Sequence, residues 1–197
     1  NTVMEMCHRI PGADVGDITS TLRLGTDRLI SGRYLAGGMG DGGGCHPRDG
    51  IALSWLARKV GLRYDFFEAL MRQRQEGTEF LADLMCEHDL PKAIVGYSFK
   101  AGTNITTGSP ALLLKSILEG RGVDVKCGDP YIDPPEPAWM RQPHVFLIGA
   151  RHPEFKGMHF PAGSVVIDPW RFVEPRHGLH TSDGSLVRVG VGPEVKP

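Results

Sequence analysis

Residues 93–127 read AIVGYSFKAGTNITTGSPALLLKSILEGRGVDVKC, and this stretch decides the fold class. The apolar run at 93–99 is rich in strand formers and predicts a first strand. Ser-Pro at the start of 109–118 predicts a helix, because proline suits the first helical turn. Two glycines end that helix, and residues 123–127 predict a second strand. Continuous apolar strands that alternate with a helix indicate a parallel sheet flanked by helices.

The rest of the C-terminal half extends this pattern. Residues 145–150 and 165–167 predict two more buried strands, and the proline-rich stretch 133–143 predicts a loop with one helical turn near Trp139. In the tail, we expect a hairpin around Asp183-Gly184.

The N-terminal half reads as helical. Residues 1–10 have helical apolar spacing, Asp14 can cap a second helix, and residues 65–86 predict a long helix. Asp49 is a plausible N-cap for a further helix, whose apolar side chains within 51–56 are expected on its buried side. The order is therefore a helical unit followed by an α/β unit.

A glycine-rich stretch, Tyr34–Asp49 (YLAGGMGDGGGCHPRD), separates two of the predicted helices. Six glycines at this density suit a backbone that turns sharply or lies against a ligand. The stretch delivers Cys45 to the mouth of a helix, where the helix N-terminus, His46 and Arg48 favour a thiolate. We interpret it as a substrate cradle that carries a cysteine nucleophile. The alternative is a surface loop with an ordinary free cysteine. A phosphate-binding P-loop is disfavoured because no Gly-Lys-Ser/Thr follows.

Composition excludes several classes. The chain has 197 residues and a net charge of −1, which argues against a nucleic-acid or acidic-membrane partner. No apolar run approaches the roughly 20 residues of a membrane span, and no signal peptide is visible. The four cysteines form no CxxC pair and no histidine pair suits zinc, so we expect no metal site and a reducing, cytoplasmic setting. We expect Cys7, Cys86 and Cys127 in the core.

GGMGDGGGCHPRD resembles the GxGxGGxCxPKD signature of the UDP-glucose/GDP-mannose dehydrogenase family, the nucleotide-sugar 6-dehydrogenases. The stretch from Val95 to Pro134 is similar to the start of that family's C-terminal domain, and FLIGARHPEF and VVIDPWRF continue the match. The resemblance runs from Asn1 to about Glu174. It implies a central helical dimerisation segment over residues 1–90 and a Rossmann-like, nucleotide-sugar-binding α/β domain over 91–197. It also implies that this chain is a fragment without the NAD domain, and inactive alone.

The implied reaction is an oxidation of a sugar C6 alcohol to a carboxylate with two NAD. In this reaction Cys45 is the nucleophile, Asp49 assists the water and Arg48 lies near the cofactor. The resemblance assigns nucleotide-sugar contacts to the glycine-rich loop and the second domain: Tyr34, Leu35, Ala36, Gly37, Gly38, Gly42 and Lys100. We expect Arg171 either to contact the nucleotide or to lie on the surface.

Two departures from the family pattern stand out. Thr107 replaces an arginine that usually approaches NAD, and Leu29 alters the motif before the cradle. The resemblance implies a homodimer through the helical segment and a UDP- or GDP-sugar substrate. The alternative function is a dimerising module that binds nucleotide sugars without turnover.

Overall fold

The computed structural model describes residues 2–26, 35–40, 42–133, 137–175 and 185–192. Within these residues, four α-helices precede the first strand: α1 (Thr2–Arg9), α2 (Val15–Arg23), α3 (Cys45–Lys59) and α4 (Phe66–Cys86). The side chain of Asp14 caps α2 by accepting a hydrogen bond from the Gly16 N–H, as predicted. Asp65 caps α4 in the same way through the Glu68 N–H. None of the described helices has the length and apolar run needed to cross a bilayer.

A parallel sheet of five strands follows in the order β2-β1-β3-β4-β5. The strands are β1 (Lys92–Val95), β2 (Val125–Gly128), β3 (Val145–Ile148), β4 (Val165–Asp168) and β5 (Leu186–Arg188). The connecting helices are α5 (Pro110–Gly120), the 3-10 turn η2 (Ala138–Arg141) and α6 (Pro153–Lys156). The α/β prediction is confirmed. Asp183-Gly184 lies outside the described residues, and β5 joins the sheet in parallel with β4.

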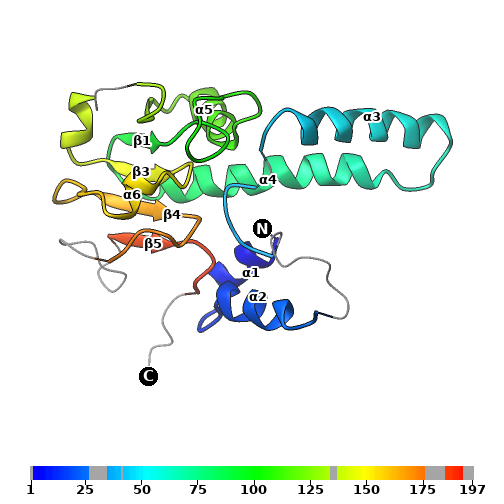
Figure 1. Cartoon of the computed structure of the whole chain (residues 1–197), viewed down its shortest axis with the longest axis horizontal. Coiled ribbons are helices and arrows are strands. Elements are labelled where there is room, and N and C mark those ends of the chain that lie inside the picture. Colours follow the sequence, from blue (N-terminus) through cyan, green and yellow to red (C-terminus); the bar gives the residue numbers. More distant parts are fainter. Residues whose placement is uncertain (1, 27–34, 41, 134–136, 176–184, 193–197) are drawn as a thin grey trace.

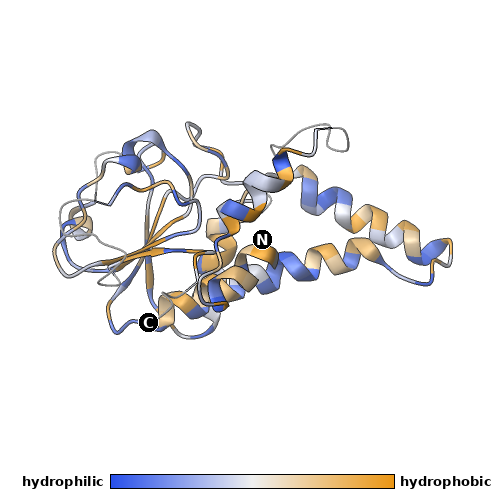
Figure 2. Ribbon diagram, turned by 90° about the horizontal axis from the view of Figure 1, so that it is seen from below, coloured by the Kyte–Doolittle hydropathy of each residue, from blue (hydrophilic) through white to orange (hydrophobic). Residues whose placement is uncertain are grey.

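Both faces of the sheet are buried because successive strand residues point to opposite sides. Ile94 belongs to one core cluster together with the C-terminal half of α4, with α5 and with Met4 and Cys7 of α1. Its neighbours Ala93 and Val95 pack on the other side with Met140 of η2 and with Phe155 and Phe160. The orange interior strands in Figure 2 reflect this double burial. Since Met4 and Cys7 share a core with the sheet, the first helix is fixed to the α/β unit.

Helices α3 and α4 form an antiparallel hairpin that projects from the sheet (Figure 1). The hydroxyl of Ser54, which is fully buried, donates to Asp65 Oδ2 at 2.6 Å and ties the two helices together. The expected burial of α3 is wrong: Ile51, Leu53, Trp55 and Leu56 are 41–60% exposed. These side chains are exposed on the hairpin, and Figure 2 shows apolar segments out towards its tip.

Two further expectations need correction. Helix α3 starts at Cys45 with Gly44 as its N-cap, so Asp49 lies inside the helix, one turn after the thiol, and is not the N-cap. The helix begins earlier than predicted because Pro47 suits a first helical turn. Cys86 is exposed at the end of α4, whereas Cys7 is buried as expected.

Candidate active site

The glycine-rich segment 35–44, here called the collar, lies between α1 and the start of α3 and packs on the α/β unit (Figure 1). Position 41 and Tyr34 lie outside the described residues. A Cβ at Gly38 would lie 2.3 Å from the ring of Trp170, and one at Gly42 would lie 3.2 Å from the carbonyl oxygen of Phe99. Bare backbone is therefore what lets the collar approach the sheet loops.

The collar also makes a backbone contact with the loop after β1. We call residues 96–109 the β1 loop. The Gly43 N–H donates to the Gly108 carbonyl at 3.1 Å. Gly43 and Gly108 have φ values of 84° and 71°, in the left-handed region that favours glycine. This pair fixes the last turn of the collar two residues before the cysteine.

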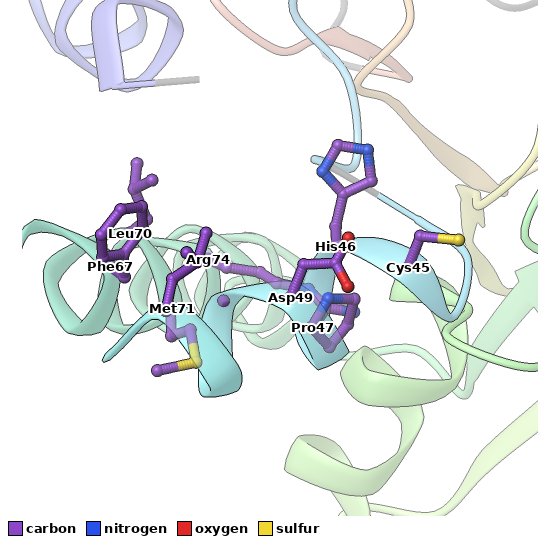
Figure 3. Close-up of a pocket in the computed structure, with 10 residues that line it drawn as sticks. Cys45, His46, Pro47, Asp49, Phe67, Leu70, Met71 and Arg74 are labelled. Atoms are coloured by element: carbon purple, nitrogen blue, oxygen red, sulfur yellow. The ribbon is translucent and has the colours of Figure 1, made fainter. Parts of the chain in front are cut away.

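Cys45 is the first residue of α3, and it is a free, exposed thiol. Its position at a helix N-terminus places it beside backbone N–H groups that have no partner within the helix. In Figure 3 the sulfur points away from Phe67, Leu70 and Met71. The thiol is therefore accessible, and it is not packed in hydrocarbon.

Asp49 follows Cys45 by four residues, so both lie on one face of α3. Arg48 Nε donates to Asp49 Oδ1 at 2.8 Å. This hydrogen bond is the main cause that lowers the pKa of the Asp49 carboxyl, with His46 adding a smaller effect. The same bond raises the pKa of the Arg48 guanidinium, and the nearby Cys45 raises it further. Asp49 is thus a carboxylate held one turn from the thiol.

A cavity of about 280 Å³ lies beside these groups, in the hairpin between α3 and α4 (Figure 3). Its walls include Cys45, Asp49 and Leu53 from α3 and Phe67, Leu70 and Met71 from α4. Arg74 of α4 also lines the cavity, and its remaining polar side chains are those of Cys45, His46 and Asp49. The cavity is formed by the helical unit alone, so it is separate from the contact between the collar and the sheet.

Lys100 is exposed on the β1 loop, at the carboxyl edge of the sheet where parallel α/β folds bind ligands. Phe99, its neighbour, packs its ring on Gly43. The structure therefore brings the loop of Lys100 against the collar that leads to Cys45. Leu35 and Ala36 lie at the other end of the collar, where the Leu35 carbonyl accepts a hydrogen bond from Arg23.

Arg171 is engaged within the protein. Its two terminal nitrogens bind the two carboxylate oxygens of Asp14, at 2.7 and 2.8 Å. This pair joins the loop after β4 to the N-cap of α2. The backbone of Arg171 has a φ of 57°, and the buried carboxylate of Asp168 holds this turn by accepting N–H bonds from Trp170, Phe172 and Val173. Burial raises the pKa of Asp168.

The sequence reading missed three residues that shape this region. Trp170 supports Gly38, and Phe99 supports Gly43. His152 is fully buried under the β1 loop, 3.1 Å from Asp129 Oδ2 and 3.0 Å from Ser98 Oγ. A tryptophan directly after a strand was a usable signal. A single histidine in FLIGARHPEF was not, because its partners lie 23 and 54 residues away.

In the described part of the chain, the loop after the first strand of the sheet is not of the dinucleotide-binding type. The β1 loop lacks the GxGxxG pattern, and Arg48, the residue expected near NAD, is exposed and paired with Asp49. Within the same residues, no group of three or more His, Cys, Asp or Glu side chains could hold a metal ion.

Comparisons with known proteins identify relatives of this chain. Residues 1–75 match the family model described as UDP-glucose/GDP-mannose dehydrogenase family, central domain. The chain is 30% identical over 139 residues to UDP-glucose 6-dehydrogenase TuaD of Bacillus subtilis (strain 168), an alignment that covers 68% of this chain and 30% of the relative. It is 33% identical over 101 residues to GDP-mannose 6-dehydrogenase of Pseudomonas aeruginosa, covering 51% of this chain and 23% of the relative.

The fold has a solved counterpart. The chain superposes on a UDP-glucose dehydrogenase from Pyrobaculum islandicum with a TM-score of 0.75 at 23% identity, over 87% of this chain and 43% of that one. The chain spans about a third of the length of the curated UDP-glucose 6-dehydrogenases it matches. The family model, the aligned relatives and the shared fold lead to one conclusion: the chain belongs to the UDP-glucose/GDP-mannose dehydrogenase family.

Proposed function

We propose that this chain supplies the thiol and the nucleotide-sugar site of a nucleotide-sugar 6-dehydrogenase. The observation that carries the proposal is the exposed Cys45, held at a helix start by a glycine collar that docks on the carboxyl-edge loops of a parallel sheet. Ligands of such sheets bind at this edge. A sugar bound alongside the collar and the β1 loop would therefore lie close to the thiol.

The proposed chemistry is covalent at Cys45. The thiolate adds to the C6 aldehyde of the sugar and forms a thiohemiacetal, whose loss of a hydride gives a thioester. Water then attacks the thioester, releasing the carboxylate and returning the sulfur as the leaving group. NAD, when bound by the enzyme, supplies the two-electron acceptor for each oxidation. Because the β1 loop lacks the dinucleotide-binding pattern, we propose that NAD is held mainly by another part of the enzyme, and we assign the covalent and substrate-binding roles to this chain.

Asp49 is proposed to orient the attacking water. Its carboxylate is one helical turn from the thiol, and its lowered pKa keeps it charged at neutral pH. A carboxylate of low pKa is a weak base, so we expect it to position the water more than to take its proton. Arg48 balances the charge of Asp49 and is retained as the proposed contact to the cofactor.

The proposed substrate contacts combine both units. The backbone of Leu35, Ala36, Gly37, Gly38 and Gly42 would line the sugar nucleotide, together with Tyr34. Lys100 would meet its phosphates from the β1 loop, since a lysine suits a phosphate as a point charge. Arg171 is left out of this set, because Asp14 holds both of its terminal nitrogens.

The thermal unfolding temperature tests the binding proposal. A ligand at a hundred times its dissociation constant stabilises the folded state by about 2.7 kcal/mol. For a chain of this size, that corresponds to a rise of roughly 5–11 °C. We expect such a rise with one nucleotide class in a panel of UDP-glucose, UDP-N-acetylmannosamine and GDP-mannose, and a smaller rise for Lys100→Ala. No rise with any of them would refute the binding site.

The alternative is a dimerising module that binds nucleotide sugars without turnover. The exposed apolar residues of α3 favour a partner at the hairpin, and we propose a second copy of the chain. Sedimentation at several concentrations tests the dimer, with Trp55→Glu expected to shift the equilibrium to monomer. Equal molecular weights for both proteins would contradict it.

The two functions differ at the thiol. The C6 aldehyde form of the bound nucleotide sugar should block Cys45 from a thiol reagent at lower concentration than the parent alcohol if the site is catalytic. Equal concentrations would favour the binding module. The chain alone should form no NADH, and measurable NADH formation would overturn the assignment of hydride transfer to another part of the enzyme. A catalytic thiol must also stay reduced, so we propose a cytoplasmic setting.

A further inference from the structure

A buried polar network joins the start of the β1 loop to the ends of the two neighbouring strands. It consists of Ser98, Asp129 and His152, each of which is at most 2% exposed. Each of them follows a different strand of the sheet. Two aromatic rings enclose the imidazole: Tyr131 stacks on it at 4.8 Å, and Phe155 meets it edge-on at 5.4 Å. Burial of three polar groups is costly unless each is paired, so the network must make specific bonds.

The hydrogen bonds determine how the imidazole is protonated. The Gly102 N–H donates to Nδ1 at 3.2 Å, so Nδ1 carries a lone pair. The proton of the neutral ring is then on Nε2, which faces both Asp129 Oδ2 and Ser98 Oγ. Ser98 and Asp129 therefore contact the same ring nitrogen. A hydrolytic serine triad uses opposite nitrogens and an accessible serine, so this network is not one.

The network holds the β1 loop at both ends of a short segment. At one end, Asp129 Oδ2 accepts the Ser98 N–H at 2.9 Å, and the Ser98 hydroxyl donates to the Lys100 carbonyl at 3.1 Å. At the other end, His152 Nδ1 accepts a hydrogen bond from the Gly102 N–H. Lys100 lies between these anchors. Its backbone is thus fixed by bonds that start from the imidazole and the carboxylate.

The same segment contacts the collar. The Phe99 carbonyl faces Gly42, and the Phe99 ring packs on Gly43, two residues before the thiol. We propose that His152 is a positioning residue for nucleotide-sugar binding, which fixes residues 98–102 so that Lys100 and the collar meet one ligand. The inference rests on the proposed function, and it adds a residue that touches neither the ligand nor the thiol.

Three variants test the proposal. His152→Phe keeps the ring between Tyr131 and Phe155 but removes both nitrogens. His152→Gln keeps an N–H donor for Asp129 and should recover part of the effect. His144→Phe is the matched control, because His144 is also buried and packed among aromatic rings but lies at the opposite edge of the sheet.

Two measurements separate positioning from stability. The first is the amide exchange of Gly102 without ligand, and the second is the dissociation constant for UDP-glucose and GDP-mannose by calorimetry. In His152→Phe we expect exchange and the dissociation constant each to rise about tenfold, the equivalent of one buried hydrogen bond. His152→Gln should fall between, and His144→Phe should change neither value, although it lowers stability.

Each outcome has a consequence. Faster Gly102 exchange with an unchanged dissociation constant would overturn the positioning role, and so would an equal loss of affinity in His144→Phe. Unchanged exchange in His152→Phe would overturn the anchor itself. If the unmodified chain binds neither nucleotide sugar, the proposed function fails, whereas the exchange data still decide whether His152 anchors the loop. If His152→Phe does not fold, His152→Gln against the unmodified chain decides both measurements.

Discussion

The Gly108→Ala substitution tests whether the collar depends on the β1 loop. Gly108 has a φ of 71°, and an added Cβ would lie 2.3 Å from the Gly43 carbonyl oxygen and 2.4 Å from its carbon. A left-handed conformation costs a non-glycine residue about 1–2 kcal/mol. Overpacking against backbone adds roughly 1–3 kcal/mol. Loss of the hydrogen bond between Gly43 and Gly108 adds about 0.5–1.5 kcal/mol.

Gly122→Ala provides the matched control. Gly122 has a φ of 75° after α5, but a Cβ there would meet nothing within 4 Å. Gly122→Ala should therefore lower the free energy of unfolding only by the cost of the left-handed conformation, about 1–2 kcal/mol. Urea unfolding of both variants gives the difference, which we expect to be roughly 1.5–4.5 kcal/mol larger for Gly108→Ala. Equal free energies of unfolding would refute the claim that the collar rests on the β1 loop.

Three further predictions concern the helical unit and the thiols. Asp14→Asn keeps a helix cap but removes the charge facing Arg171, so it should lower the free energy of unfolding by about 1 kcal/mol. Asp14→Ala also removes the cap and should lower it by about 1 kcal/mol more. An Asp14→Asn protein as stable as the unmodified chain would count against a stabilising pair of Asp14 and Arg171. The hydrogen bond from the Ser54 hydroxyl is the main cause that lowers the pKa of Asp65 below the ordinary value of 3.8. The stability that Asp65 contributes is therefore present at pH values above 3.8, and it is lost as the pH falls through the folded-state pKa. Ser54→Ala should therefore raise the pKa of Asp65 in an NMR titration and move acid unfolding to higher pH, and an unchanged titration would remove the hydroxyl as the cause. Burial raises the pKa of Cys127 to about 11, so at pH 8 a thiol reagent should modify Cys45 and Cys86 quickly and Cys127 slowly; equal rates would contradict the burial of Cys127.

Much of the α/β unit could be predicted from local patterns. The strand at 93–99, the Ser-Pro helix start and the glycines after it act over a few residues, and Ser109 caps α5 through the Leu112 N–H. In the helical unit, the predicted cap Asp14 is similarly local, since it bonds an N–H two residues away. The first strand was predicted too long, because Gly96 at a φ of 81° turns the chain away from the sheet.

The errors came from interactions that local patterns do not contain. The apolar residues of α3 satisfied helical periodicity, but periodicity does not say whether the apolar side meets the rest of this chain or another surface. Asp49 had the right residue type for an N-cap, yet the N-cap of this helix is Gly44, five residues earlier. The network of Ser98, Asp129 and His152 joins residues after three strands, and only the sheet order brings them together.

In the candidate site, too, some residues could be predicted from local sequence and others depend on distant contacts. The collar and Cys45 were visible in the sequence, because six glycines and a cysteine before a helix are a local signal. The contacts that support the collar were not, since Phe99 and Trp170 are each distant in sequence from the glycine that they contact, although the position of Trp170 directly after a strand was a usable signal. Arg171 followed a strand as a ligand contact would, but its partner Asp14 lies 157 residues away.

The most direct test of the central claim is alkylation of Cys45 with iodoacetamide, followed by peptide mass spectrometry, with and without saturating UDP-glucose or GDP-mannose. Cys86 is the internal control, because it is also exposed but lies at the far end of α4. If the collar holds the thiol against a sugar bound by the β1 loop, one of the two nucleotide sugars should slow modification of Cys45 at least tenfold and leave Cys86 unchanged, in keeping with about 1.4 kcal/mol per factor of ten. Modification of Cys45 at the same rate with and without both ligands would contradict the account.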